Sequence, residues 1–211
     1  LKTQKQYEAL DALVGIIANY MLTNELPSLS KREAKQIFSD YLSERNLQLD
    51  KDQLFDEMLD RSGILVEDVT RGVVLFKHRS FAEFYYAKNL LSKQSVEITD
   101  QVFHPYWLNS YFFYIGLKRD CPELLNQVID YPIQNEGHRL SRMMNLGSLL
   151  LAGYQSPYSV IKKGLMSAFS DASDYYVGIL RGTSESPFSR LPPMHLMALM
   201  KGILEHGYSY N

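Results

Sequence analysis

Apolar residues recur every three or four positions through the first sixty residues, which is the spacing of one buried helical face. This pattern predicts three helices. The first spans Lys5 to Leu22. The second begins after Ser30, because Ser30 and Glu33 have the spacing of a capping box, in which two side chains satisfy backbone N–H groups of the first helical turn. The third begins with a weaker cap at Asp50 and ends at Gly63, a residue suited to a left-handed helix cap.

The period then changes from that of a helix to that of strands. Ile64–Val66 and Val73–Phe76 are short apolar, β-branched runs separated by a polar segment, and this arrangement predicts a β-hairpin. Three helices followed by a two-stranded wing is the order of a winged-helix domain, a relative of the helix-turn-helix. After the wing, Ser80 and Glu83 predict a second capping box and a helix through Leu91 that is rich in aromatic residues.

The second half of the chain shows no further strand pattern. A polar stretch, residues 92–99, is the expected linker. Beyond it, Pro122, Pro157 and Pro192 are spaced 35 residues apart at positions suited to the first turn of a helix. This interval suits helical repeats, whereas the residues around the prolines match poorly, so a bundle and a repeat array both remain open. We therefore predict a mainly α protein with a winged-helix domain at residues 1–95 and a helical domain at residues 96–211.

Composition and charge exclude several classes of protein. The chain has 22 Lys and Arg against 24 Asp and Glu, and a net charge of −2 gives no overall attraction to nucleic acid or an anionic membrane. Cys121 is the single cysteine, which excludes an intramolecular disulfide and a Cys-rich zinc site. No apolar run approaches the ~18 residues of a spanning helix. We expect a cytoplasmic protein without membrane contact, and the opening on Leu1 suggests a piece of a longer protein.

Motifs for independent catalysis are absent from the sequence. It contains no phosphate-binding loop and no G-x-G-x-x-G, G-x-S-x-G or H-E-x-x-H pattern, and its five histidines are scattered. We therefore expect the chain by itself not to be an enzyme, to hold no metal and to need no cofactor of its own.

DNA binding by the winged helix would use the third predicted helix as the recognition helix. Residues 50–61 carry a net charge of −3, and DNA phosphates repel an acidic helix in the major groove. Lys31, Arg32 and Lys35 form a small basic cluster on the second helix, which we interpret as a solvated face. Nucleic acid is therefore not an expected partner. A DNA-binding transcription regulator with a helical effector or dimerisation domain remains the alternative function.

The most specific stretch is FKHRSFAEFYYAKNL at residues 76–90. It resembles the F-x-H-x-S-F-x-E-[FY]-x-x-A-x-x-L signature that closes the winged-helix domain of NACHT proteins, a branch of the STAND signalling NTPases. The residues in register are Phe76, His78, Ser80, Phe81, Glu83, Phe84, Ala87 and Leu90. The resemblance covers about residues 5–92, and residues 107–125 are more loosely similar to the helical region that follows in such proteins.

The resemblance implies that His78 contacts the phosphates of ADP held by a separate nucleotide-binding domain and so maintains a closed resting state. Arg79 adds a fixed charge beside it, and a helix N-terminus offers N–H groups to anions. We expect Phe76 and Phe81 to pack the wing onto the helices, and Glu83 to act as a cap.

The nucleotide-binding motifs of the family are absent from this sequence. The resemblance therefore implies an upstream nucleotide-binding domain in the same chain, with ADP or ATP and magnesium as its cofactors and oligomerisation on activation. The hypothesis is a regulatory region of a NACHT-like signal-transduction ATPase, in the setting of anti-phage defence. If His78 is merely structural, a plain helical scaffold is the third hypothesis.

Overall fold

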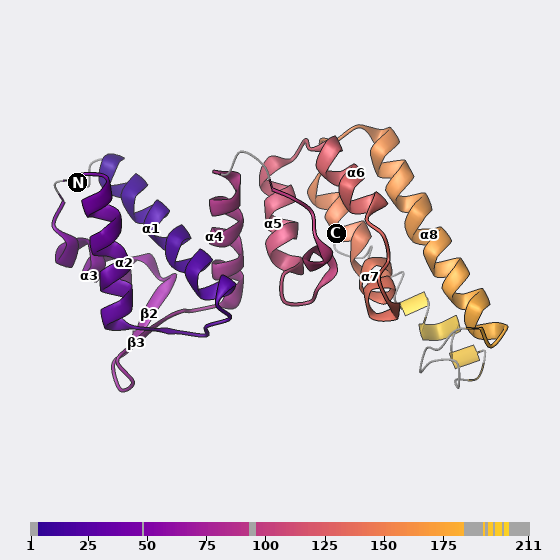
Figure 1. Ribbon diagram of the computed structural model, residues 1–211, viewed down its shortest axis with the longest axis horizontal. Coiled ribbons are helices and arrows are strands. Elements are labelled where there is room, and N and C mark those ends of the chain that lie inside the picture. The colour runs from indigo at the N-terminus through magenta and orange to yellow at the C-terminus, as the bar shows by residue number, and fades with distance from the viewer. Residues whose placement is uncertain are drawn as a thin grey trace. The chain divides into compact units, whose positions relative to one another are not determined.

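A computed structural model of the protein shows mainly helical architecture (Figure 1). It describes residues 4–47, 49–92, 96–183, 192, 194–195, 197–199 and 201–202. The chain divides into two compact units, Leu1–Gln94 and Ser95–Asn211. Among the described residues, the one sheet lies in the first unit, which confirms the predicted mainly α class. No described helix is both long enough and apolar enough to cross a membrane.

The first unit contains the predicted helices and hairpin together with one further strand. Its elements are α1 (Gln4–Thr23), β1 (Leu29–Ser30), α2 (Lys31–Glu44), α3 (Lys51–Ser62), β2 (Leu65–Asp68), β3 (Val73–Phe76) and α4 (Arg79–Leu91). The strand order is β1-β3-β2, with β3 antiparallel to both neighbours. Helix α1 packs along α4, while α2 packs against α3.

The core of the first unit joins the helices to the sheet. Leu13 and Ile17 of α1 are fully buried. Phe38 of α2 and Phe55 of α3 are also fully buried, and their rings meet edge to face at 5.2 Å. Leu65 of β2 is buried with them. Burying side chains of this size is the main contribution to folding, and it fixes the relative placement of α2 and α3.

The helix ends of the first unit mostly follow the predicted signals. At α2, the N–H of Glu33 donates to the Ser30 hydroxyl at 3.1 Å, and the N–H of Ser30 donates to the Glu33 carboxylate at 3.0 Å, which confirms the capping box. Asp50 caps α3 by accepting from two N–H groups of its first turn. Gly63 ends α3 with φ +62°, the expected left-handed cap.

The second predicted capping box, at Ser80 and Glu83, is wrong. Helix α4 begins at Arg79, and its N-cap is His78, which makes no side-chain capping hydrogen bond. The helix begins one residue earlier than predicted, and the N–H of Phe81 already donates to the carbonyl of His78 at 3.0 Å. Glu83 therefore lies one turn inside α4, where it is buried.

The second unit consists of helices packed around α7. Its elements are the 3-10 helix η1 (Asp100–Phe103), α5 (Leu108–Lys118), α6 (Pro122–Asp130), α7 (Glu136–Ala152) and α8 (Tyr158–Leu180). Helix α7 contacts both α5 and α8. Gly164 allows α8 to approach α7 closely, because a Cβ atom there would lie 2.7 Å from the Leu150 side chain. Pro122 occupies the first turn of α6 as predicted, Pro157 is the N-cap of α8, and the residues on both sides of Pro192 lie outside the described part of the chain.

Candidate functional site

The junction between β3 and α4 exposes His78. The N–H of Lys77 donates to the carbonyl of Ile64 at 2.8 Å, which continues the hairpin pairing up to the residue before His78. His78 then adopts an extended backbone, with φ −136° and ψ 141°, as the N-cap of α4. Its side chain is exposed, and its ring centroid lies 5.8 Å from that of Phe81. The hairpin and the helix together place an imidazole at a helix N-terminus that no side chain caps.

Arg79 lies next to His78 and is paired with the buried carboxylate of Glu83. The Nε atom of Arg79 donates to Oε1 of Glu83 at 2.8 Å. The Arg79 side chain is 51% exposed, whereas the Glu83 side chain is only 3% exposed. A buried carboxylate requires a charged partner, so Glu83 constrains the guanidinium through Nε. The charge of Arg79 is accessible to an anion, because half of the side chain faces solvent.

The two phenylalanines expected beneath the wing are buried to different extents. Phe76 ends β3 and is 8% exposed, in agreement with the expected packing role. Phe81 is only half-buried, beside the His78 ring. The sequence motif contains both residues in register, but it carries no signal for how deeply each side chain lies.

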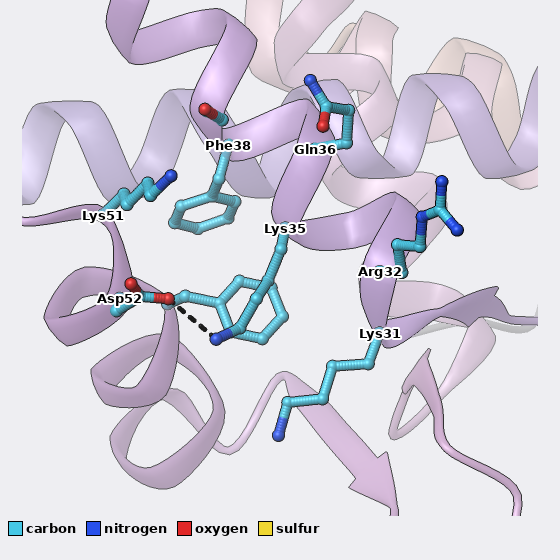
Figure 2. Close-up of a pocket in the computed structure, with 9 residues that line it drawn as sticks. Lys31, Arg32, Lys35, Gln36, Phe38, Lys51 and Asp52 are labelled. Carbon is cyan, nitrogen blue, oxygen red and sulfur yellow. Dashed lines mark hydrogen bonds and ion pairs between the residues drawn. The ribbon is translucent and has the colours of Figure 1, made fainter.

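A cavity between the N-terminal turns of α2 and α3 forms a second polar site in the first unit (Figure 2). Its volume is about 540 Å³. Figure 2 shows Lys35 extending from α2 to Asp52 of α3, with Lys51 on one side and Arg32 on the other. The predicted basic cluster of α2 is accessible to solvent, as expected, and it also lines this cavity. Sequence reasoning missed Lys51, which joins the cluster from another helix.

Two of the basic residues at this cavity are neutralised by ion pairs. Lys31 donates to Glu67 at 2.7 Å, and Lys35 donates to Asp52 at 2.8 Å. The hydrogen bond between Lys35 and Asp52 raises the pKa of Lys35 and lowers the pKa of Asp52, so both groups are charged at neutral pH. Both pairs are partly exposed to solvent.

The second unit contains a buried polar network between α7 and α8. The Nε atom of Arg142 lies 3.0 Å from Oδ2 of Asp171. The guanidinium of Arg142 also donates to the carbonyl of Tyr131 at 3.0 Å and to the Ser167 hydroxyl. Burial raises the pKa of Asp171. These contacts join three segments and have no exposed reactive group, so we assign them a structural role.

Two further features of the second unit bear on chemistry. Burial raises the pKa of Cys121, which keeps this thiol protonated and unsuited to nucleophilic catalysis. Among the described residues, no group of three or more His, Cys, Asp or Glu side chains could hold a metal ion.

Comparison with known protein families finds two matches to separate parts of the chain. Residues 27–86 are similar to the family described as Novel STAND NTPase 4, a range that runs from β1 into α4 and includes His78 and Arg79. Residues 148–211 are similar to NACHT C-terminal Helical domain 1. This second match begins at the end of α7 and does not include residues 107–125, for which the sequence predicts a looser resemblance to the same helical region. No curated protein and no solved structure matches the chain significantly.

Proposed function

Because this chain contains parts of a NACHT-type STAND NTPase, we propose that its first unit contacts the phosphates of bound ADP and thereby stabilises the resting state of the signalling protein. The observation that carries this proposal is the exposed His78 at the uncapped N-terminus of α4. A helix N-terminus favours anions through its N–H groups and its dipole, and an imidazole can donate to a phosphate oxygen. The nucleotide itself would be held by a separate nucleotide-binding domain.

Arg79 and Glu83 fit the same role. Arg79 supplies a permanent positive charge next to His78, and the buried Glu83 limits the conformations that the guanidinium can adopt. A constrained guanidinium loses less conformational freedom when it binds an anion. Glu83 would act through Arg79, as a positioning residue.

The chain would then regulate a nucleotide cycle without performing the chemistry. ADP and magnesium would be bound by the nucleotide-binding domain, and the helical unit would serve in sensing or packing. The similarity of residues 148–211 to NACHT C-terminal Helical domain 1 supports the placement of this unit in a signalling protein. The proposed setting in anti-phage defence, and oligomerisation on activation, rest on the family resemblance.

The experiment is His78→Ala in a protein that joins this chain to its nucleotide-binding domain. Losing one charge-assisted hydrogen bond of about 1.5–3 kcal/mol would weaken ADP binding roughly 10- to 150-fold. The ADP dissociation rate should rise accordingly, and basal signalling should increase because the resting state loses the same free energy.

The matched control is Lys77→Ala, which removes an exposed cation from the preceding position. Both variants should keep the melting temperature of the ADP-free protein. If His78→Ala lowers that melting temperature and leaves the ADP dissociation rate unchanged, His78 is a structural residue and the proposed function is wrong.

A further inference from the structure

We propose that the cavity between α2 and α3 binds the phosphate group of a small phosphorylated ligand, mainly through Arg32 and Lys51. This site is separate from His78 and does not depend on the function proposed above. It is built within the first unit, from the N-terminal turns of two helices that the buried contact of Phe38 with Phe55 holds together.

The shape of the cavity suits a compact ligand. The cavity volume of about 540 Å³ exceeds that of a phosphate group and leaves room for a small organic portion. Phe38 and Phe55 are fully buried and contribute to its floor, so the base of the cavity is rigid. Gln36 and Ser39 add neutral hydrogen-bonding groups to the lining.

The distribution of charge identifies the residues available to an anion. Glu67 already neutralises Lys31, and Asp52 already neutralises Lys35. The nearby charge of Asp56 also raises the pKa of Lys35. Within the described part of the chain, Arg32 and Lys51 have neither an ion pair nor a side-chain hydrogen bond, and both are exposed at the cavity. They lie on opposite sides of the cavity, and each acts on a neighbouring carboxylate without pairing with it, Arg32 on Glu33 and Lys51 on Asp52. An anion that enters the cavity would meet these two exposed cations.

The chemistry of these two cations favours phosphate. A guanidinium pairs with two phosphate oxygens at once, and an ammonium adds a third contact without a directional requirement. The exposed pair of Lys35 with Asp52 contributes little to stability, so Lys35 can move its hydrogen bond to a doubly charged ligand. Arg32 and Lys51 are exposed on opposite sides of the cavity, so their side chains would change rotamer to reach the same phosphate group as Lys35.

The charges along α3 disfavour the binding of an extended polyanion such as duplex DNA. Beyond the cavity, α3 exposes Asp56 and Asp60, so a phosphate backbone that follows α3 would be repelled. A small ligand avoids these carboxylates because it occupies only the N-terminal end of the helix.

The test is a titration of the 211-residue chain with pyrophosphate, followed by amide NMR. We expect saturable shifts confined to residues 31–39 and 51–55. The double variant Arg32→Gln with Lys51→Gln should weaken binding by about a hundredfold, since each of the two lost charge-assisted contacts changes affinity by about tenfold. The matched control is Arg71→Gln with Lys162→Gln, which removes the same two charges at exposed positions outside the cavity and should change binding by less than about twofold.

Titrations with ADP and with duplex DNA distinguish the classes of ligand that could bind the cavity. Equal affinity for pyrophosphate and ADP would show that the phosphates alone are recognised, whereas tighter binding of ADP would show that the organic portion also contacts the cavity; either supports the site. Equal weakening by the cavity variants and the control variants would overturn it. So would shifts spread over all basic residues, or saturable nanomolar binding of duplex DNA. Because the readout is at α2 and α3, a negative result leaves the His78 proposal standing, and His78→Ala should not change this titration.

Discussion

At the scale of single residues, His138 is a buried imidazole whose protonation state follows from its contacts. It is 9% exposed, and the centroid of its ring lies 5.1 Å from that of Phe103 and 5.7 Å from that of Tyr131. Its Nδ1 accepts a hydrogen bond from the N–H of Gln134 at 3.2 Å, so the neutral ring carries its proton on Nε2. Burial, with a smaller contribution from the charge of Arg142, lowers the pKa of His138.

This lowered pKa predicts acid sensitivity of the second unit. Because the folded pKa of His138 lies below the unfolded value of 6.5, its contribution to stability is present above pH 6.5 and is lost as the pH falls through the folded pKa. The melting temperature should therefore fall between about pH 7.5 and 5.5.

The variant His138→Gln isolates this contribution. Asp171 acts in the opposite sense, because its raised pKa contributes stability at low pH that is lost as the pH rises. Comparing the pH slopes of the parent and the variant cancels Asp171, which both proteins retain. Identical slopes in the two proteins would show that His138 does not titrate as described.

Phe76 and Phe81 predict different costs for the same truncation. Phe76→Ala removes a ring that is 8% exposed and should cost about 3–5 kcal/mol of the free energy of unfolding. Phe81→Ala removes a half-buried ring and should cost roughly half as much, because less apolar surface is removed from water in the folded state. Urea denaturation of both variants measures the two costs, and equal values would contradict the structural difference.

At the scale of elements, two glycines respond oppositely to the same substitution. Gly63 caps α3 with φ +62°, and a Cβ atom there would meet nothing within 4 Å. Gly63→Ala should therefore destabilise the chain by about 1 kcal/mol through backbone strain alone. Gly116 lies inside α5, where an added Cβ would lie 3.9 Å from Ala152, an ordinary contact.

Gly116→Ala should stabilise the chain by about 0.5–1 kcal/mol, because alanine has the higher helix propensity and restricts the unfolded chain. The pair is measured as shifts in the urea midpoint at constant slope. A stabilising Gly63→Ala would mean that α3 does not end in a left-handed cap.

At the scale of the whole molecule, the chain should show no nucleotide chemistry of its own. His78 and Arg79 could supply only about two charge-assisted contacts to ADP, each of roughly 1.5–3 kcal/mol before the cost of immobilising the ligand. In the 211-residue chain with Arg32→Gln and Lys51→Gln, which removes the proposed cavity site, calorimetry should therefore give an ADP affinity in the millimolar range or weaker. The unmodified chain should not hydrolyse ATP. Micromolar affinity of this double variant for ADP would contradict the division of labour with a separate nucleotide-binding domain.

The sequence by itself determined the features that depend on neighbouring residues. Helical periods, the Ser30 capping box, the Gly63 cap and the two strand runs all act over a few residues, so they could be predicted and are confirmed. The motif around His78 also lies within a short stretch of sequence, and the family matches support its resemblance to NACHT proteins. The motif did not predict the first residue of α4 correctly, because the pairing of Lys77 with Ile64 in the hairpin determines where α4 begins.

Only the tertiary structure decided which side chains meet. β1 has two residues and therefore no period to detect, and it exists as a strand because β3 offers it a partner. Glu83 is a carboxylate at a helical position that the fold buries beside Arg79. Lys51 lies far from Arg32 in sequence, and the packing of α2 on α3 brings both to one cavity. Such contacts depend on the free energy of burying whole faces, which local sequence patterns do not specify.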